Sequence, residues 1–312
     1  MRVLATISDM IRLGVVLDLE SGATATIPIR PEFIDPNPDG AFSCRPFGIT
    51  WKPDELYIAN HRQLLVFDKQ LQYLRTLSTP LQINIHQLAY HRGCVWAVSP
   101  RTNSLIGVYP SSGASAIEFN LLNQNLCPYI PRQTSDAEDK NHFNSLLWAN
   151  GYLFVAAHNF AQPSFINTYE GATLHLDYTR HDAGSGVHGL ALYNEELFWI
   201  STLTDEIRSS LGYSQRLSKQ GYSRGFAMNH EHFVVATSEF LHRDKRRNGD
   251  SWIQVIDRQQ GTLVSEFHLR GTGSINDLRL LDSYDYAHCI DPFWSESEAE
   301  KATTLCCLDE HT

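Results

Sequence analysis

Polar residues that can bind metal ions or move protons recur at the ends of apolar, strand-like runs in this 312-residue chain. In "NHFNSLLWANGYLFVAAHN" (141–159), His142 and Asn144 begin the first of two runs that an Asn-Gly pair joins, and His158 follows the second run. An Asn-Gly pair between alternating runs predicts a β-hairpin. The polar side chains then gather at the open end of this hairpin, where imidazole can act as a metal ligand or as a general base.

The plan of this hairpin is repeated along the chain. Each copy has an apolar run, a turn, a second run, a polar break and a third run, and the other copies lie at 47–68, 86–109, 188–207, 224–269 and 274–290. The last copy stops early, but "VLATIS" and "RLGVVLDLESGATATIPI" near the N-terminus can supply its missing strands. Repeats of roughly 40–50 residues with four short strands are typical of a β-propeller.

The sequence therefore predicts an all-β fold, a six-bladed β-propeller over 1–290, with its last blade closed by the N-terminal strands. Two sandwich domains would explain the alternation but not the recurring order of runs and breaks. For the C-terminal tail, 291–312, we expect disorder.

In a propeller the first strand of each blade lines the central channel. Aligning the copies on their second strands places six residues where the innermost strands begin: Phe47, His86, Asn144, His188, Arg224 and Asn276. Arg45, His142 and Tyr222 lie two residues earlier on the same strand face, and Gln87 and Asp277 lie one residue later. The loops after the second strands reach the same end with His61, His158 and Glu239. The sequence thus predicts a polar site at one mouth of the channel.

His86, Asn144 and His188 are the predicted metal ligands, because imidazole binds first-row divalent ions and three protein ligands leave open positions for catalysis. The alternative is that these side chains solvate one another in a wet channel. The predicted substrate-binding residues are Arg224, Arg45, Asn276, Gln87 and His61, and the predicted catalytic residues are His142, Asp277, His158, Tyr222 and Glu239. The arginines indicate an anionic ligand, with a carboxylate of the protein, Asp277 or Glu239, as the alternative partner.

The connections at 30–44 and 120–140 are long enough to serve as lids over this mouth. The net charge of −10 argues against nucleic-acid binding, and the basic cluster "RDKRRN" (243–248) is typical of a solvated loop. No apolar run is long enough to cross a membrane. Six irregularly spaced cysteines do not indicate a disulfide framework, so we expect a cytoplasmic protein.

"NSLLWANGYLFVA" (144–156) and "HGLALYNEELFWIS" (188–201) resemble inner-strand motifs of six-bladed propellers in the senescence-marker-protein/gluconolactonase superfamily. The first residue of such motifs binds a divalent metal there, and the enzymes open sugar lactones. In this chain His188 stands where that family has Asp, and Phe47 where it has Glu, which favours zinc, manganese or iron over calcium. "NHFNSLLW" also resembles the His-x-Asn-Gly-Leu signature of an uncharacterised propeller family.

The function predicted from these observations is a metal-dependent enzyme of hydrolase or lyase type, acting on a small polar or anionic metabolite at the channel. One alternative is a metal-free isomerase or cyclase with histidine general bases. Another is a non-catalytic propeller that binds a protein partner. The sequence leaves the oligomeric state open.

Overall fold

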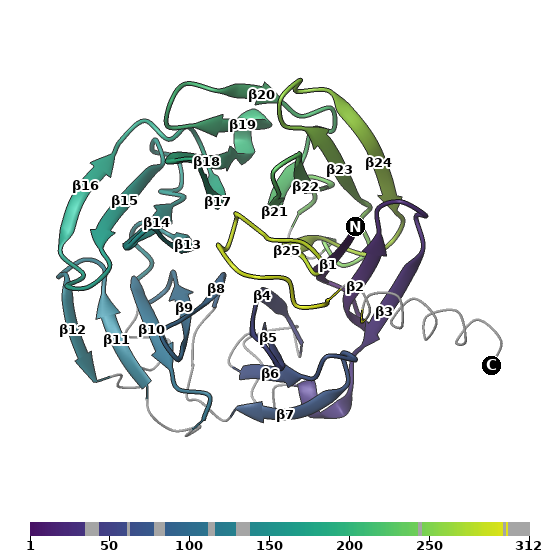
Figure 1. Cartoon of the computed structure of the whole chain (residues 1–312), viewed down its shortest axis with the longest axis horizontal. Helices are drawn as coiled ribbons and strands as arrows, with labels where there is room; N and C mark the ends of the chain where they lie inside the picture. The colour runs from purple at the N-terminus through teal and green to yellow at the C-terminus, as the bar shows by residue number, and fades with distance from the viewer. Residues whose placement is uncertain are drawn as a thin grey trace.

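The computed structural model describes residues 1–34, 44–60, 63–77, 85–111, 116–128, 138–242, 245–295 and 298. These residues form six antiparallel sheets arranged as a ring, which confirms the predicted six-bladed β-propeller (Figure 1). Two short 3-10 helices, η1 (Pro31–Phe33) and η3 (Thr202–Thr204), lie in connections. Within the described ranges, no helix has the length and hydrophobicity that crossing a membrane requires.

The strands of blades 1 to 3 follow one another in sequence. Blade 1 contains β4 (Pro46–Lys52), β5 (Glu55–Asn60), β6 (Gln63–Phe67) and β7 (Tyr73–Leu77). Blade 2 contains β8 (Leu88–His91), β9 (Cys94–Ser99), β10 (Ser104–Val108), β11 (Ala116–Asn120) and a fifth strand, β12 (Asn125–Pro128). Blade 3 contains β13 (Phe143–Ala149), β14 (Tyr152–Ala157), β15 (Phe165–Glu170) and β16 (Leu176–Arg180).

Blades 4 and 5 repeat the same order, and blade 6 combines both ends of the chain. Blade 4 contains β17 (Val187–Tyr193), β18 (Glu196–Ser201), β19 (Glu206–Ser209) and β20 (Ser214–Arg216). Blade 5 contains β21 (Tyr222–Met228), β22 (His232–Ser238), β23 (Ser251–Asp257) and β24 (Leu263–Leu269). Blade 6 contains β25 (Ile275–Leu280), β1 (Arg2–Ile7), β2 (Arg12–Asp18) and β3 (Thr24–Pro28).

Burial decreases from the channel outward. The inner strand β13 is buried along its whole length, because both faces of its sheet pack against neighbouring blades. The outer strand β24 alternates between exposed and partly buried positions until its last residue. This gradient explains why the sequences of the inner strands are nearly continuous apolar runs, whereas those of the outer strands alternate.

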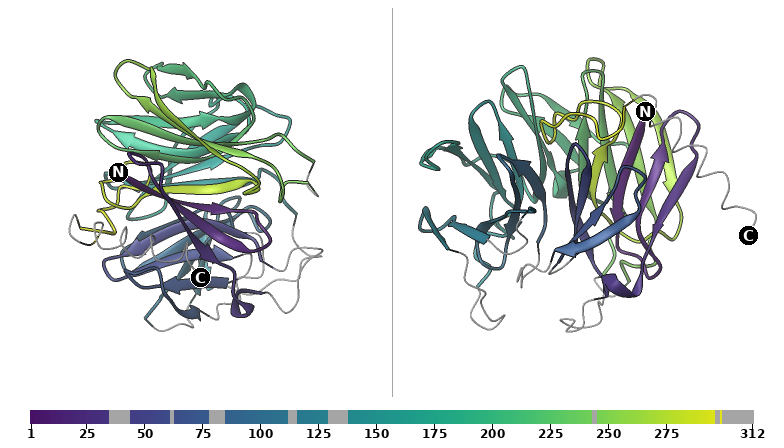
Figure 2. Two further views of the ribbon diagram at one scale, coloured as in Figure 1. Left: turned by 90° about the vertical axis from the view of Figure 1, so that its right-hand side faces the viewer. Right: turned by 60° about the horizontal axis from the view of Figure 1, so that its bottom comes forward.

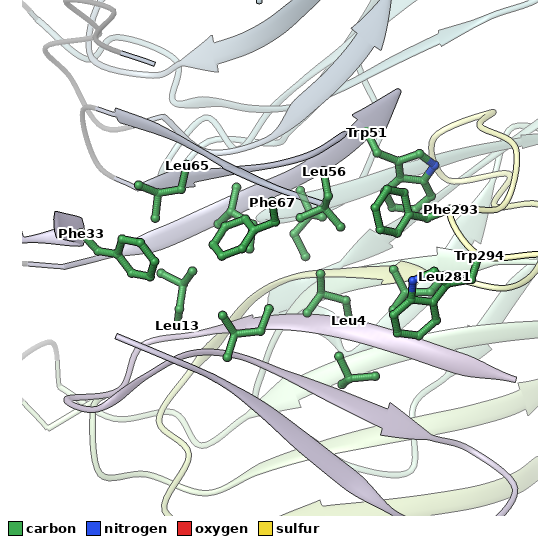
Figure 3. Close-up of a cluster of buried hydrophobic side chains, with 14 of the residues drawn as sticks. Leu4, Leu13, Phe33, Trp51, Leu56, Leu65, Phe67, Leu281, Phe293 and Trp294 are labelled. Carbon is green, nitrogen blue, oxygen red and sulfur yellow. The ribbon is translucent and has the colours of Figure 1, made fainter. Parts of the chain in front are cut away.

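The ring is closed by β1, which lies between β25 and β2, as the sequence predicted (Figures 1 and 2). Leu4 pairs with Arg279 on β25 and with Val16 on β2. Leu4 also belongs to a buried apolar cluster between blades 6 and 1, to which blade 1 contributes Leu56 and Phe67 (Figure 3). The closure therefore combines a hydrogen-bonded ladder with a continuous core.

Residues 281–294, which we call the strap, run from β25 across the middle of the ring (Figure 1). The strap is bonded to blades 1, 5 and 4 near the ends of their inner strands: Trp51 Nε1 to Asp291 O (2.9 Å), Tyr286 N to Met228 O (2.8 Å) and Leu192 N to Tyr286 O (3.1 Å). Phe293 and Trp294 are buried in the cluster between blades 6 and 1. Their packing extends the propeller four residues beyond the predicted boundary at 290, while 301–312 lie outside the described residues.

Replacing Leu4 by Ala should lower the free energy of unfolding by about 2–5 kcal/mol, because the side chain is fully buried in the closing cluster. Leu211→Ala is the matched control: this leucine is 78% exposed and its truncation should change stability by less than about 0.5 kcal/mol. Urea unfolding followed by tryptophan fluorescence measures both. Equal stability of the two variants would show that the closure contributes little.

Candidate functional site

A β-bulge recurs in all six blades at the same end of the inner strand, which we call the mouth end. There, an extra residue of the inner strand faces a single residue of the second strand. The bulged residues are Phe47 with Gly48, His86 with Gln87, Asn144, Gly189, Arg224 and Asn276. A bulge breaks the alternation of side chains and re-aims the extra residue. Five of the six residues that the sequence analysis aligned therefore sit at bulges, and His188 directly precedes the sixth.

The bulged strands surround a cavity of about 10 Å³, which is the space of about one water molecule. The structure brings together here most of the residues predicted to bind metal or substrate. The cavity is lined by Phe47, His86, Gln87, Asn144, Ser145, His188, Arg224, Asn276 and Asp277.

Several of these side chains link neighbouring blades. The bonds join Leu146 N to Gln87 Oε1 (2.9 Å), Asn144 Nδ2 to Val187 O (2.8 Å), Asn276 Nδ2 to Pro46 O (2.7 Å) and Ile49 N to Asp277 Oδ2 (2.9 Å). Asp277 also forms a buried ion pair with Arg279. Each bond satisfies a backbone group that a bulge or a strand end leaves without a ladder partner. These four residues therefore have a structural role in addition to lining the cavity.

Aromatic and imidazole rings form a continuous arc around the mouth. The distances between ring centroids are 4.9 Å for Phe47–His86, 5.0 Å for His86–His142, 5.6 Å for His142–His158, 5.5 Å for His158–His188 and 5.9 Å for His188–Tyr222. The arc crosses five blades. The predicted catalytic residues His142, His158 and Tyr222 thus lie directly beside the predicted ligands His86 and His188.

The hydrogen bonds of His188 define its tautomer. Its Nδ1 lies 2.9 Å from both Gly186 O and Thr202 Oγ1, and the Thr202 hydroxyl donates to Ser223 O. Both neighbours of Nδ1 are therefore acceptors, so Nδ1 carries the proton. The His188 side chain is only 5% exposed, and its other nitrogen, Nε2, is buried without a hydrogen-bond partner. It is left as a lone pair that can accept a hydrogen bond.

Burial and nearby positive charge keep the histidines neutral. Burial, and then nearby groups that include the Arg224 guanidinium, lower the pKa of His86 well below its ordinary value. Burial and Arg224 do the same to the pKa of His188. Burial, followed by His142 and Arg224, lowers the pKa of His158 to about 4. Near neutral pH these imidazoles can act as bases or as hydrogen-bonding groups.

Three arginines lie close enough to Tyr222 to affect its pKa, and one of them, Arg224, also lines the cavity. The Arg224 guanidinium lies 4.2 Å from the centre of the Tyr222 ring, and that of Arg246 lies 5.0 Å from it. Arg45 lies over Phe47 at 4.9 Å. Burial raises the pKa of Tyr222, but the three arginines together lower it below its ordinary value. The mouth is therefore a region of positive potential on a chain whose net charge is −10.

Arg224 lacks the partner that a buried guanidinium usually has. Its side chain is 9% exposed, one Nη1 bond goes to the neutral Asn276 Oδ1 (3.1 Å), and Nε has no partner. Among the described residues no carboxylate forms an ion pair with it. Asp277 and Glu239, the alternative partners predicted from the sequence, are engaged elsewhere. Asp277 pairs with Arg279, and Glu239 accepts a hydrogen bond from Asp250 N (2.9 Å) in its own loop.

His142 is held by a residue that the sequence analysis missed. Asp139 accepts the backbone N–H of His142 (2.8 Å) and contacts its Nδ1 (2.6 Å). These bonds hold His142 in the left-handed backbone region, with φ of 51°. Because Asp139 engages Nδ1, the other nitrogen, Nε2, is available to a ligand. The spacing Asp-x-x-His is the only sequence signal for this pair.

The side chains fit a metal centre only in part. His188 has the lone pair and the Nδ1 bond of a typical metal ligand. However, no three His, Cys, Asp or Glu side chains within the described ranges are placed to hold a metal ion. Asn144 is engaged on both its atoms, by Val187 O and Ser145 Oγ, and the cation Arg224 shares the cavity. The predicted set of His86, Asn144 and His188 therefore does not fit a three-ligand site, and we derive no step through a metal.

Some predicted elements lie elsewhere. Glu239 is engaged in the β22–β23 loop, away from the cavity lining. His61 and the segments 35–43 and 129–137 of the two predicted lids fall outside the described residues. The basic cluster at 243–248 is more than a solvated loop, because its Arg246 packs over Tyr222. Because Tyr222 and Arg246 lie far apart in the sequence, no local pattern predicted this contact.

Comparisons with known proteins show the fold and not the family. No family model matches the chain, and no curated protein matches its sequence. A protein of unknown function from Bacteroides caccae matches with a TM-score of 0.57 and 9% identity, over 89% of this chain and 97% of that one. A chain of a nidogen/laminin complex matches with a TM-score of 0.56 and 9% identity, over 89% of this chain and 97% of that one. Luciferin-regenerating enzyme matches with a TM-score of 0.52 and 12% identity, over 74% of this chain and 78% of that one.

These neighbours support the propeller but leave its role open. They include an enzyme, as the luciferin-regenerating enzyme shows, and a component of a protein complex. At such low identity the similarity carries no site residues with it. Membership of the senescence-marker-protein/gluconolactonase superfamily therefore stays a prediction.

The lowered pKa of His158 should make the protein less stable in acid. The folded state favours the neutral form of His158. Its contribution to the free energy of unfolding is therefore complete above the pKa of the unfolded state, about 6.5, and is lost as the pH falls towards 4. His158→Gln removes it. The stability advantage of the wild type over this variant should shrink between pH 7 and 4.5 by about 1–2 kcal/mol, after discounting for partial exposure.

The measurement is urea unfolding of both proteins at pH 7, 5.5 and 4.5. His230→Gln is the control for loss of an imidazole outside the site, because the His230 side chain is 68% exposed and lies in the β21–β22 turn. Parallel pH profiles of wild type and His158→Gln would contradict a lowered pKa at His158.

Proposed function

We propose that the channel mouth binds a small, hydroxylated, anionic metabolite and that the protein is an enzyme that moves protons on it. The observation that carries this proposal is Arg224, a buried cation that lines the cavity without an ion-pair partner among the described residues, since the one carboxylate in the lining, Asp277, pairs with Arg279. A buried charge without an opposite partner costs several kcal/mol. An anionic ligand would compensate that cost, and the planar guanidinium fits a carboxylate or phosphate.

The neutral histidines supply the second half of the recognition. The Nε2 lone pair of His188 repels an anion but accepts a hydrogen bond from a hydroxyl group. A ligand with an anionic group at Arg224 and a hydroxyl at His188 would satisfy both orphaned groups together. Hydroxy acids and hydroxylated phosphate esters have this combination.

The pair of Asp139 and His142 supports proton transfer. With Nδ1 held by Asp139, His142 can take a C–H or O–H proton of the ligand on Nε2. For a C–H proton, the electron pair of the broken bond moves into the adjacent carbonyl or carboxylate, whose growing negative charge the arginines would stabilise. Return of the proton to a neighbouring atom completes an isomerisation, and loss of a β-hydroxyl group as water completes an elimination. Tyr222, with its lowered pKa, is the second candidate for the proton.

This proposal corresponds to the metal-free alternative from the sequence. The predicted zinc, manganese or iron ion stays a prediction with its own test, elemental analysis of protein purified without a His tag. Activity that survives chelation would favour the histidine chemistry, and loss of activity with loss of stoichiometric metal would favour the metal.

Arg224→Gln should abolish anion binding, because Gln keeps a polar group but removes the charge. In isothermal titration calorimetry with inorganic phosphate and with citrate, we expect at least tenfold weaker binding for this variant. Arg92→Gln is the matched control, since Arg92 is an exposed arginine in the β8–β9 turn at the other end of the blade. Binding that is equal in all three proteins, or absent from the wild type, would refute the anion site.

Proton transfer is tested by deuterium exchange. The protein is incubated in D₂O with a panel of hydroxy acids and sugar phosphates, and the loss of C–H signals is followed by proton NMR. We expect exchange in at least one compound, slowed about 100-fold or more in His142→Gln. Asp139→Asn should also slow it, because an amide no longer selects the tautomer of His142.

The control for both variants is His230→Gln, which should exchange at the wild-type rate. Anion binding without exchange in any compound would leave a binding protein and overturn the enzymatic part of the proposal.

A further inference from the structure

Three large apolar side chains stand exposed beside the basic mouth. Phe160, Leu203 and Phe240, which we call the collar, are 47%, 48% and 71% exposed. Each lies in the loop that follows the second strand of its blade, in blades 3, 4 and 5 respectively. Because second strands end at the mouth end, the collar occupies three neighbouring loops on one side of the channel. Single exposed apolar residues are ordinary, but a group that borders one polar site is not.

The collar contacts the same side chains that form the site. The Phe160 ring lies 5.3 Å from that of His142 and 6.3 Å from that of His158. The Phe240 ring lies 5.9 Å from that of Tyr222. Leu203 and His158 both pack against Gly186, where a Cβ atom would lie 3.0 Å from Leu203 Cγ and 3.2 Å from His158 Nε2. The apolar side chains of the collar therefore lie in direct contact with the polar side chains of the mouth.

We propose that the ligand of this site is an amphiphile: an anionic head group bound at Arg224 and a short alkyl or acyl chain laid across the collar. This inference rests on the proposed anion site and adds the class of its ligand. The positive head site and the apolar rim complement the two halves of such a molecule. The cavity of about 10 Å³ is too small for the chain, so the chain has to leave the channel across the rim.

Blade 6 carries the same feature. Met10 and Ile11 are 60% and 69% exposed in the loop between β1 and β2, which is equivalent to the loops of the collar. In that loop Ser8 Oγ accepts a hydrogen bond from Asn276, which lines the cavity (2.9 Å). Exposed apolar side chains therefore also lie at the mouth end of blade 6, which neighbours blade 5 and its Arg224.

The test is a series of monoalkyl phosphates from methyl to octyl, titrated calorimetrically below their critical micelle concentrations. If the chain lies on the collar, the dissociation constant should fall about two- to fourfold for each added methylene until the chain passes the rim. The double variant Leu203→Ser/Phe240→Ser should flatten this dependence at least by half. Leu211→Ser, at a 78% exposed leucine outside the mouth, should keep the wild-type slope.

The outcomes separate this inference from the function on which it rests. Methyl phosphate binding that Arg224→Gln abolishes, with no dependence on chain length, would overturn the amphiphile and keep the anion site. Failure of every member to bind would overturn both. A third arm uses vesicles of phosphatidylcholine with phosphatidylglycerol: binding to vesicles that octyl phosphate does not displace would overturn the single-ligand proposal in favour of docking on a lipid surface.

Discussion

The pairing of β1 with β25 is the constraint on which the rest of this molecule depends. It joins Leu4 to Arg279 and so connects the two ends of the chain within one sheet. The site is assembled from the corresponding end of every inner strand, so the separation of its side chains is set by the circumference of the ring. An open ring would move Arg224 and His86 apart without any change in either blade. Closure is thus as much a condition for the site as for stability.

The polar residues around the cavity divide into two groups. Gln87, Asn144 and Asp277 bond backbone groups of adjacent blades, and those bonds fix the positions of the inner strands. Arg224 and His188 keep buried polar atoms without protein partners. The bonds of the first group fix the inner strands, so that the polar atoms of the second group cannot move to find hydrogen-bond partners within the protein. Buried polar atoms without a partner also occur elsewhere among the described residues, for example both ring nitrogens of His288, but at the mouth they border a cavity that a ligand could reach.

The sequence was sufficient for the architecture because four-strand repeats impose a regular pattern of apolar runs and turns. It was also sufficient to align the channel residues, because equivalent residues of the inner strands lie at the same distance from the channel axis. The bulges were not predictable, because one extra residue changes side-chain direction without changing composition. Asp139 and Arg246 were missed for another reason: they come from connections between strands, whose paths depend on tertiary contacts. Arg279, the partner of Asp277, follows it by two residues on β25 and was not predicted, because Asp277 was assigned a catalytic role at the mouth.

The strap lies on the opposite side of the ring from the proposed site. Its hydrogen bonds to Trp51, Met228 and Leu192 place it at the ends of the inner strands away from the mouth. If the strap closes that end to a ligand, entry and release share the mouth. Release of one molecule would then have to precede entry of the next, and the rate of release would limit the turnover of an enzyme built in this way.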